Sequence, residues 1–381
     1  MIIVEILFWM SLLFLLYVYG GYVVLTLPFK RQPQVTDESL RPTCTLVIAA
    51  YNEEKIIGQK IENSLALDYP KELLEIIIVA DGSTDRTQDV IGHYPSVKFF
   101  YQPERQGKLA AIQRIWPAIQ SEIVVFTDAN SFLNSTAIKS LVQHFADPKV
   151  GGVSGEKKVS RLPTTTGTEG LYWKYESWLK KKDAEFYSIA GAAGELFAIR
   201  STLYTPLDEN LVLDDFIQSM LVCNQGYRVV YEQSAVAAEL PSPTLKDEFA
   251  RKVRIAAGGF QATSYLNNKM DFRKFPKLGF VYFSHRVFRW QLAPFAFFAL
   301  LPLNIFIGMF HQSPFYLTVL VFQVFFYILA IVRNYFSIYG KSTTFISLVH
   351  YFFFMQLAVI AGWIKFKGKR QTAIWEKIPR M

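Results

Sequence analysis

The chain has 381 residues, of which 51% are hydrophobic and 16% aromatic, and its net charge is +8. This length allows one substantial domain with membrane segments or two domains, and the apolar residues gathered at the two ends favour the first. The charge fits a nucleic-acid binder, an anionic membrane or a phosphate-rich substrate, and the apolar ends favour the last two, so no nucleic-acid partner is expected. Cys44 and Cys223 form no zinc motif and are expected to be buried thiols.

The amino-terminal segment predicts a membrane anchor within residues 1–30. Residues 6–29 carry no charge, and these 24 positions are enough to cross a bilayer as a helix. A secretory signal peptide is the alternative, but no basic leader precedes the run and no cleavage pattern of small residues follows it. Lys30 and Arg31 come next, so the positive-inside rule predicts that the following domain is cytoplasmic.

Residues 43–240 alternate between short apolar runs and amphipathic stretches, after a linker that contains prolines. The expected strands are 44–49, 75–80, 97–101 and 123–128, with helices up to Leu67, from Asp85 and from Lys108 to about Ile119. Repeated βα units of this length predict an α/β domain with a doubly wound, mostly parallel sheet. Nucleotides are the commonest ligands of such sheets, and they bind at the carboxyl ends of the strands.

The fourth expected strand ends in Asp128, and Asn130 follows two residues later. Extended backbone points the two side chains the same way, so both oxygens could hold one hard cation such as Mg²⁺. An Asx turn that caps a helix beginning near residue 134 explains the same residues. The second expected strand also ends in a carboxylate, Asp81, and this repetition favours a ligand site at the sheet edge.

Four motifs follow one another along these strands: Ala50-Tyr51-Asn52-Glu53, Asp81-Gly82-Ser83-Thr84-Asp85, Gln106-Gly107-Lys108 and Asp128-Ala129-Asn130. Their order resembles that of the family 2 inverting glycosyltransferases with a GT-A fold. The resemblance is to the membrane-embedded group that makes cellulose, chitin, hyaluronan and poly-N-acetylglucosamine, and it covers roughly residues 43 to 262. The chain has no dinucleotide GxGxxG and no Walker lysine.

The resemblance implies roles for the matching residues. The donor-binding residues it implies are Ala50, Tyr51, Glu53, Asp81, Lys108 and Asp128. Asp128 and Asn130 would handle the metal and the diphosphate, with Mg²⁺ or Mn²⁺ as the cofactor. Asn130 stands where the family has a second Asp, so the metal site keeps an oxygen ligand but loses one charge.

Residues 150–156 are expected to form another edge strand, and residues 171–178 an aromatic-rich helix. Trp and Tyr rings can stack on sugars, although core packing or contact with the membrane interface explains the same aromatics. A run of small residues between 190 and 194 allows close approach of the backbone to a substrate, and the resemblance implies an acceptor-side loop there. The expected acceptor-binding residues are Glu156, Trp178, Gly191 and Gly194.

Asp214 and Asp215 are the expected catalytic residues. Transfer with inversion needs a base that takes the proton of the acceptor hydroxyl. The pair lies where the family carries its Glu-Asp or Thr-Glu-Asp motif, which makes Asp215 the expected base ahead of Asp214. A helix N-cap is the alternative role for either residue.

Arg251 and Arg254 are expected on one face of a helix that begins near Leu245, where two guanidinium groups could grip a diphosphate. A basic helix lying on anionic headgroups is the alternative. The polysaccharide synthases carry Gln-x-x-Arg-Trp at the corresponding place. Here Arg251 replaces the Gln and Ile255 the Trp, so the aromatic plane that would stack on a growing chain is missing and processive synthesis is not implied.

The carboxyl-terminal part predicts interface helices over residues 241–288, about three membrane segments over 289–365 and a basic tail over 366–381. The 43 positions from 290 to 332 lack formal charge and are interrupted near 308–314, which gives two spans, and 342–364 gives a third. Three crossings after a cytoplasmic domain would put the basic tail outside, against the positive-inside rule. One segment is therefore expected to be re-entrant or interfacial, and Pro294 and Pro302 make the first the candidate.

These patterns together predict a metal-dependent, membrane-bound inverting glycosyltransferase in an inner membrane, with a cytoplasmic catalytic domain. Its donor would be a nucleotide sugar, with a UDP-sugar expected, and its acceptor a polysaccharide or a lipid-linked saccharide. One alternative is a single-addition transferase acting on polyprenyl phosphate or a glycolipid. Another is a non-catalytic nucleotide-binding subunit of a membrane export complex.

Overall fold

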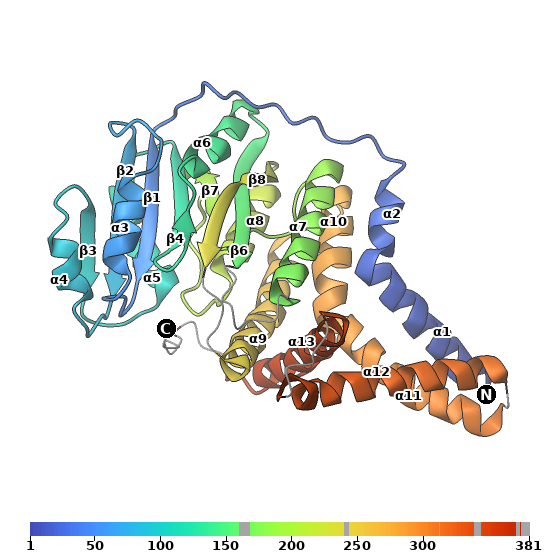
Figure 1. Ribbon diagram of the computed structural model, residues 1–381. Coiled ribbons are helices and arrows are strands. Elements are labelled where there is room, and N and C mark those ends of the chain that lie inside the picture. The colour runs from blue at the N-terminus through green and yellow to red at the C-terminus, as the bar shows by residue number, and fades with distance from the viewer. Residues whose placement is uncertain (160–167, 240–243, 312, 339–343, 371–373, 375–381) are drawn as a thin grey trace.

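The computed structural model describes residues 1–159, 168–239, 244–311, 313–338, 344–370 and 374. Within these residues an eight-stranded mixed sheet lies at one end of the molecule, and helices α11 (Ala293–Phe310), α12 (Pro314–Ile338) and α13 (Thr344–Lys367) lie at the other (Figure 1). The strand order is β3-β2-β1-β4-β7-β6-β8-β5. The strands are β1 (Cys44–Ala50), β2 (Leu74–Asp81), β3 (Lys98–Gln102), β4 (Ile123–Asp128), β5 (Phe132–Leu133), β6 (Val150–Val159), β7 (Phe197–Arg200) and β8 (Arg228–Glu239).

The first half of the sheet is parallel, as the βα pattern predicts. β1 pairs in parallel with β2 and with β4, and β2 pairs in parallel with β3. In this register Ala50 lies opposite Ala80, and Ala49 lies opposite Asp128. The carboxyl ends of these strands therefore meet at one edge, which brings Asp81 and Asp128 to the same side of the sheet.

The second half of the sheet is mixed. β7 runs antiparallel to both β4 and β6, while β6 and β8 are parallel and the short β5 is antiparallel to β8. The prediction of an edge strand at residues 150–156 is wrong, because β6 lies between β7 and β8. Its glycines reflect crowding: a Cβ on Gly151 would lie 2.7 Å from Leu203 Cδ1, and a Cβ on Gly155 would lie 2.6 Å from Leu196 Cδ2.

Helices cover both faces of the sheet because β1 alternates its buried side chains. Leu46 and Ile48 pack in one apolar cluster and Val47 in another. The first cluster contains α3 (Ile57–Leu65), α4 (Thr87–Gly92) and α6 (Ala137–Val142). The second contains α5 (Lys108–Ile115), α7 (Thr168–Phe186), α8 (Asp214–Asn224), α9 (Leu245–Lys269) and α10 (Pro276–Val281). The doubly wound architecture is therefore confirmed.

Short 3₁₀ turns adjust the ends of some elements: Trp116–Ala118, Gln143–Ala146 and Ser201–Leu203. The helix that begins at Lys108 ends at Ile115, earlier than the predicted Ile119. Pro117 has no backbone N–H to donate, so the α-helical pattern gives way to the 3₁₀ turn there.

Four helical stretches are long and apolar enough to cross a membrane by length and composition: Ile2–Thr26, Pro276–Phe310, Pro314–Val332 and Phe345–Lys367. The first joins α1 (Ile2–Leu16), a π-helical segment (Tyr17–Gly21) and α2 (Tyr22–Thr26), and the second joins α10, a π-helical segment (Tyr282–Leu292) and α11 (Ala293–Phe310). The others lie in α12 (Pro314–Ile338) and α13 (Thr344–Lys367). Residues 342 and 343 of the predicted third span, and most of the predicted basic tail, lie outside the described residues.

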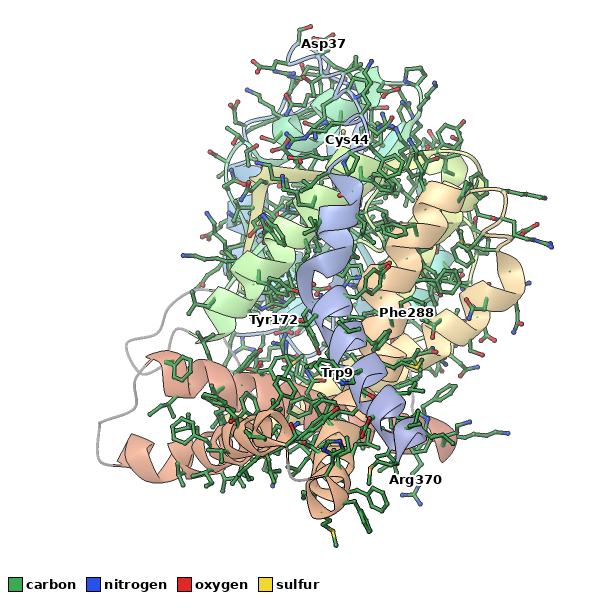
Figure 2. The ribbon with its side chains drawn as sticks, turned by 90° about the vertical axis from the view of Figure 1, so that its right-hand side faces the viewer. Trp9, Asp37, Cys44, Tyr172, Phe288 and Arg370 are labelled. Atoms are coloured by element: carbon green, nitrogen blue, oxygen red, sulfur yellow. The ribbon has the colours of Figure 1, made fainter. Side chains whose placement is uncertain are left out.

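The apolar helices contact one another and the sheet domain. Phe8 of α1 packs with Leu300 and Ile307 of α11, and Figure 2 shows this amino-terminal helix running along the molecule. α13 lies so close to α9 that a Cβ on Gly362 would come within 2.5 Å of Ala256 Cβ. α9 therefore links the sheet domain to α13.

Candidate active site

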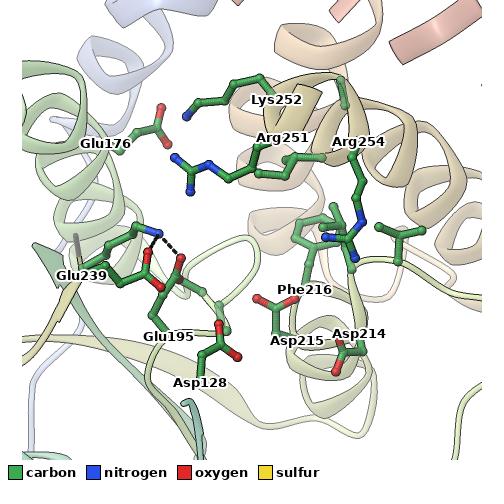
Figure 3. Close-up of a pocket in the computed structure, with 18 of the residues that line it drawn as sticks. Asp128, Glu176, Glu195, Asp214, Asp215, Phe216, Glu239, Arg251, Lys252 and Arg254 are labelled. Atoms are coloured by element: carbon green, nitrogen blue, oxygen red, sulfur yellow. Dashed lines mark hydrogen bonds and ion pairs between the residues drawn. The ribbon is translucent and has the colours of Figure 1, made fainter. Parts of the chain in front are cut away.

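A cavity of about 590 Å³ lies at the carboxyl edge of the parallel strands, bounded by strand ends on one side and by α7, α9 and α13 on the other. In Figure 3, Asp128 and Asp215 lie on one side of it and Arg251 and Lys252 on the other. The charged residues that line it are Glu53, Asp81, Arg105, Lys108, Asp128, Lys157, Glu176, Lys180, Glu195, Asp214, Asp215, Glu239, Arg251, Lys252, Arg254, Arg286 and Arg289.

Asp81 lies buried at the end of β2 and binds the loop that precedes α5. Its Oδ2 accepts hydrogen bonds from the backbone N–H groups of Gln106 (2.9 Å) and Gly107 (2.6 Å). Its Oδ1 accepts no hydrogen bond from the described residues, and Arg114 Nη2 lies 3.6 Å away. This second carboxylate oxygen is buried beside the Arg114 guanidinium.

Ala50, Tyr51 and Glu53 line the same end of the cavity, on the loop after β1. The guanidinium of Arg105 lies over the Tyr51 ring, 3.5 Å from its centroid. The sequence motifs do not single out Arg105. Its position follows from Gly82, where φ is +66° and a Cβ would lie 2.6 Å from Arg105 Cβ, so a glycine is needed for this approach.

Asp128 ends β4 and forms an ion pair with Lys108, the first residue of α5, at 2.5 Å between Oδ1 and Nζ. Burial lowers the pKa of Lys108, but the carboxylates of Asp128, Asp214 and Asp215 outweigh it and raise the pKa above its usual value. α6 begins at Ala137 without a side-chain cap, so the alternative role of Asp128 or Asn130 as a cap for this helix is not observed.

The residues present fit a hard divalent cation. Asp128 and Asn130 both line the cavity and offer oxygen ligands. Two further acids in the wall, Asp214 and Asp215, lie near Lys108. Mg²⁺ and similar ions are commonly held by one or two protein oxygens, with substrate phosphates and waters completing the shell. Within the described residues no cluster of three His, Cys, Asp or Glu ligands occurs, so a ligand would have to supply the rest.

Lys60 is hydrogen-bonded to both ends of the turn after β4, and the sequence does not indicate this role. It lies on α3 with no exposed surface, and its Nζ donates to the carbonyl of Ser131 and to Thr127 Oγ1 (3.3 Å). Burial lowers the pKa of Lys60 to about 7, against the opposing effect of Asp128. The bonds fix both ends of the segment that carries Asp128 and Asn130.

Asp214 and Asp215 form the first turn of α8 and both line the cavity. Leu213 is the N-cap residue and makes no side-chain cap, so neither acid has the predicted alternative role of N-cap. Burial, and next the charge of Asp214, raise the pKa of Asp215 to about 7. A carboxyl with a pKa near neutrality is suited to taking a proton in the transition state.

Two glycines of the small-residue run have different roles in the structure. Gly194 lines the cavity, and a Cβ there would lie 3.0 Å from Asp215 Oδ2 and 3.5 Å from Lys108 Nζ. Gly191 lies away from the cavity wall, with φ +96°, and a Cβ would overlap the ring of Phe216 at 1.9 Å. Gly191 thus allows the packing of the turn that carries Asp215.

A buried cluster that the sequence motifs missed joins β6 and β8 to the loops before β5 and β7. Lys157 of β6 donates to Glu195 and to Glu239 of β8, the latter at 2.8 Å (dashed lines in Figure 3). Ser131 Oγ also donates to Glu239, at 3.0 Å. Although burial raises the pKa of Glu195, the Lys157 ammonium outweighs it and lowers the pKa to about 2. A lysine in a glycine-rich strand was the one available signal.

The predicted basic helix is α9, and its arginines diverge. Figure 3 shows Arg254 directed toward Asp214 and Asp215, and Arg251 directed toward the centre of the cavity. Burial lowers the pKa of Arg254, while the three nearby aspartates oppose that shift. Ile255 lines the cavity where the resembling synthases carry Trp.

Aromatic side chains line the end of the cavity that faces α13. Tyr172 and Trp173 of α7 and Trp290 of the second π-helical segment belong to the wall. Trp178 is 44% exposed and lies outside the lining, because the helical repeat carries it to the other face of α7. Glu156 also lies outside the lining and accepts a hydrogen bond from Ser177 Oγ at 2.8 Å.

Parallel strands ending in acids, opposite an acid pair and a basic helix, form the kind of edge where α/β enzymes bind nucleotides. Residues 45–205, less than half of the chain, match the family model described as "Glycosyl transferase family 2". It is 26% identical over 268 residues to "Probable glycosyltransferase YdaM" of Bacillus subtilis (strain 168), covering 66% of this chain and 64% of that protein.

The chain is also 25% identical over 240 residues to the poly-beta-1,6-N-acetyl-D-glucosamine synthase of Staphylococcus aureus (strain COL), covering 61% of this chain and 58% of the synthase. The matches thus span less than two thirds of these relatives. Among solved structures, a mannosyltransferase from Pyrobaculum calidifontis matches with a TM-score of 0.75 at 20% identity, covering 97% of this chain and 100% of that one. This likeness confirms the predicted GT-A-like fold.

Proposed function

We propose that the protein is a membrane-embedded inverting glycosyltransferase that moves a sugar from a nucleotide-sugar donor, first of all a UDP-sugar, to a saccharide or lipid-linked acceptor. One observation carries the proposal: a single cavity unites Asp81, Lys108, Asp128, the acid pair and the arginines of α9. The mannosyltransferase of like fold was solved with GDP-Man and Mn²⁺, so GDP-sugars belong beside UDP-sugars in the test.

The donor nucleoside would lie at the end of the cavity formed by the loops after β1 and β2. Asp81 lines this end, and its carboxylate is suited to an N–H of the base or a ribose hydroxyl. The stacked Tyr51 and Arg105 would cover the nucleoside. Lys108 and Arg254 would face its diphosphate, because both line the cavity beside the acid pair.

Asp128 and Asn130 would hold a divalent metal, Mg²⁺ or Mn²⁺, whose chemistry is to neutralise charge on the donor diphosphate. The side chains of the protein would act on the acceptor hydroxyl and on the leaving group. Asp215 takes the proton of the acceptor hydroxyl as its oxygen bonds to the anomeric carbon. The bond from that carbon to the diphosphate oxygen breaks on the opposite face, and Arg251 and Arg254 stabilise the leaving nucleoside diphosphate.

The domain layout follows the same reasoning. We assign residues 43–240 to a cytoplasmic catalytic domain, 241–288 to interface helices, and 1–30 and 289–365 to an inner membrane, with a basic tail over 366–381. Four helical stretches of sufficient length and apolar character support membrane embedding. Lys30 and Arg31, directly after the first stretch, support the cytoplasmic side for the domain.

The test measures donor turnover by the full chain in nanodiscs, with UDP-, GDP- and dTDP-sugars, Mg²⁺ and Mn²⁺, and sizing of any sugar product. D215N should lose transfer by about 10²-fold or more while its Kd for the donor stays unchanged, because the base acts only on the acceptor. E209Q, an exposed acid six residues earlier, is the matched control. Donor binding without turnover in the wild type would favour the non-catalytic subunit, and loss of donor binding in D215N would refute its role as base.

A further inference from the structure

Lys180 of α7 is a buried lysine whose charge is favoured by Glu195, Glu176 and Glu156, although it forms an ion pair with none of them. The residue is 5% exposed and lines the cavity. Its Nζ lies over the Tyr231 ring, 5.7 Å from the centroid, and makes no hydrogen bond or ion pair with any residue that the structure describes. A buried ammonium that makes no direct ion pair or hydrogen bond is costly, so this side chain is suited to an anion supplied from outside.

Two arginines of the second π-helical segment line the same end of the cavity and share one carboxylate. Arg289 Nη2 donates to Glu176, and Arg286 Nη1 lies 3.4 Å from it. His285 Nε2 also lies 3.4 Å from Glu176. Arg289 Nη1 has no acceptor among the described residues. Burial and the nearby charge of Arg286 lower the pKa of Lys180. An incoming anion would raise this pKa again. Arg286 and Arg289 thus share one carboxylate, Glu176, while Lys180 makes a direct contact with none.

The two ends of the cavity differ in charge. The donor end has five carboxylates and three cations: Glu53, Asp81, Asp128, Asp214 and Asp215 against Arg105, Lys108 and Arg254. The other end, which we call the membrane end, has five cations, Lys157, Lys180, Lys252, Arg286 and Arg289, while Arg251 is directed toward the centre of the cavity. The wall of the membrane end has three carboxylates, Glu176, Glu195 and Glu239. Outside the wall, Glu248 lies beside Arg251 and Lys252, and the charge of Glu156 acts on Lys180, just as Arg114 lies beside Asp81 at the donor end. The donor end suits a metal ion, whereas the membrane end suits an anion.

An apolar stripe of α13 continues from the membrane end. Leu348, Phe352, Met355 and Val359 line the cavity and recur at the spacing of one helix face. They belong to a stretch, Phe345–Lys367, that is apolar and long enough to cross a membrane. A ligand that joins an anionic group to a hydrocarbon chain would match both surfaces.

We propose that Lys180, Arg286 and Arg289 form a second anion subsite, which binds the phosphate or diphosphate of a membrane-anchored acceptor whose hydrocarbon chain lies along α13. The inference rests on the proposed function and specifies its acceptor. Figure 3 shows Glu176, the partner of both arginines, and Asp215 on opposite sides of the cavity. This separation leaves space for an acceptor sugar between its lipid phosphate and the base.

The test measures equilibrium binding and needs no turnover. Farnesyl phosphate, farnesol and inorganic phosphate are titrated by native mass spectrometry into the full chain in detergent, with a separate titration of the nucleotide-sugar donor. Wild type should bind farnesyl phosphate at least tenfold more tightly than farnesol, because charge-assisted hydrogen bonds add to the apolar contact. K180M should lose that advantage, while K181M, an exposed lysine of the same helix, should keep it.

Unchanged donor affinity in K180M would support a separate subsite, whereas a parallel loss of donor affinity would assign Lys180 to the donor and overturn the inference. Equal affinity for farnesyl phosphate and farnesol, or no effect of K180M, would also overturn it. Competition by inorganic phosphate at the same concentration as farnesyl phosphate would reject the lipid as the source of the anion. Because binding is measured directly, these results are independent of whether donor turnover is found.

Discussion

Gly194 and Asp215 face each other so closely that a Cβ on the glycine would lie 3.0 Å from the carboxylate oxygen Oδ2. The loop before β7 and the first turn of α8 therefore fix each other across the cavity. G194A should displace Asp215 and lower kcat by about 10²-fold, as expected for a small misplacement of a reacting group. Donor Kd should change little. G92A, where a Cβ meets nothing within 4 Å, is the control, and an unchanged kcat in G194A would contradict the assigned position of the base.

The acid pair gives a prediction about pH. Burial and Asp214 raise the pKa of Asp215 to about 7, so the ionised base and kcat should increase as pH rises through about 7. D214N removes the negative charge of Asp214, so the pKa of Asp215 should fall and the midpoint of the kcat profile should move to lower pH. Burial remains, so the midpoint should stay above the ordinary value of 3.8. A profile that keeps its midpoint in D214N would mean that Asp215 is not the group that titrates.

Asn130 predicts weaker metal binding than an Asp would give. N130D adds a carboxylate to a site with one acid, Asp128, and should lower the Mn²⁺ concentration for half-maximal turnover by about tenfold, since ligand charge tunes affinity. N268D places the same change on an exposed position of α9 and should have no effect. If both variants require the wild-type Mn²⁺ concentration, residue 130 does not bind the metal.

Lys60 should affect the metal site without touching it. K60M removes the bonds to Ser131 and Thr127 that fix the turn, and it should raise the Mn²⁺ requirement roughly tenfold or more, as losses of supporting contacts commonly do. The buried lysine has a pKa lowered to about 7, so the unfolded chain binds more protons between pH 7 and 10.5. Wild-type stability should therefore rise with pH in that interval.

The matched control for this site is K55M, an exposed lysine nearby on the chain. Thermal unfolding in detergent between pH 7 and 10 should show the rise in stability for wild type and K55M, and a smaller rise for K60M. Equal slopes in all three proteins would show that Lys60 does not titrate in this range. An unchanged Mn²⁺ requirement in K60M would separate the lysine from the metal site.

The sheet and the donor end could be predicted because their signals are local. Asp81 and Asp128 each follow an apolar run, and parallel pairing alone brings such strand ends together. The place of β6 could not be predicted in this way, since glycines that relieve crowding inside a sheet resemble those of an edge. Because β6 was predicted at the sheet edge, a lysine in this glycine-rich strand was a signal for a buried position but did not identify Glu195 and Glu239 as its partners.

The membrane end depends on packing between distant segments, so single motifs do not reveal it. Arg286 and Arg289 meet Glu176 more than a hundred residues away. One signal was available: these arginines lie within a stretch, Pro276–Phe310, that is otherwise apolar enough to cross a membrane, and charges in such segments are functional candidates.

Trp290 and Trp178 allow a direct comparison, because the sequence predicts Trp178 as an acceptor-binding residue whereas the structure places Trp290 in the cavity wall. Trp290 lines the cavity and packs on Phe216, with ring centroids 5.3 Å apart, next to the acid pair. It could supply the aromatic plane that Ile255 lacks. W290A should therefore raise the acceptor KM by roughly threefold to tenfold, in line with an aromatic contact of about 1 kcal/mol, and W290F should restore most of it. W178A should leave the acceptor KM unchanged, since Trp178 lies outside the lining. The opposite pattern would restore the acceptor role predicted for Trp178 and remove Trp290 from the site.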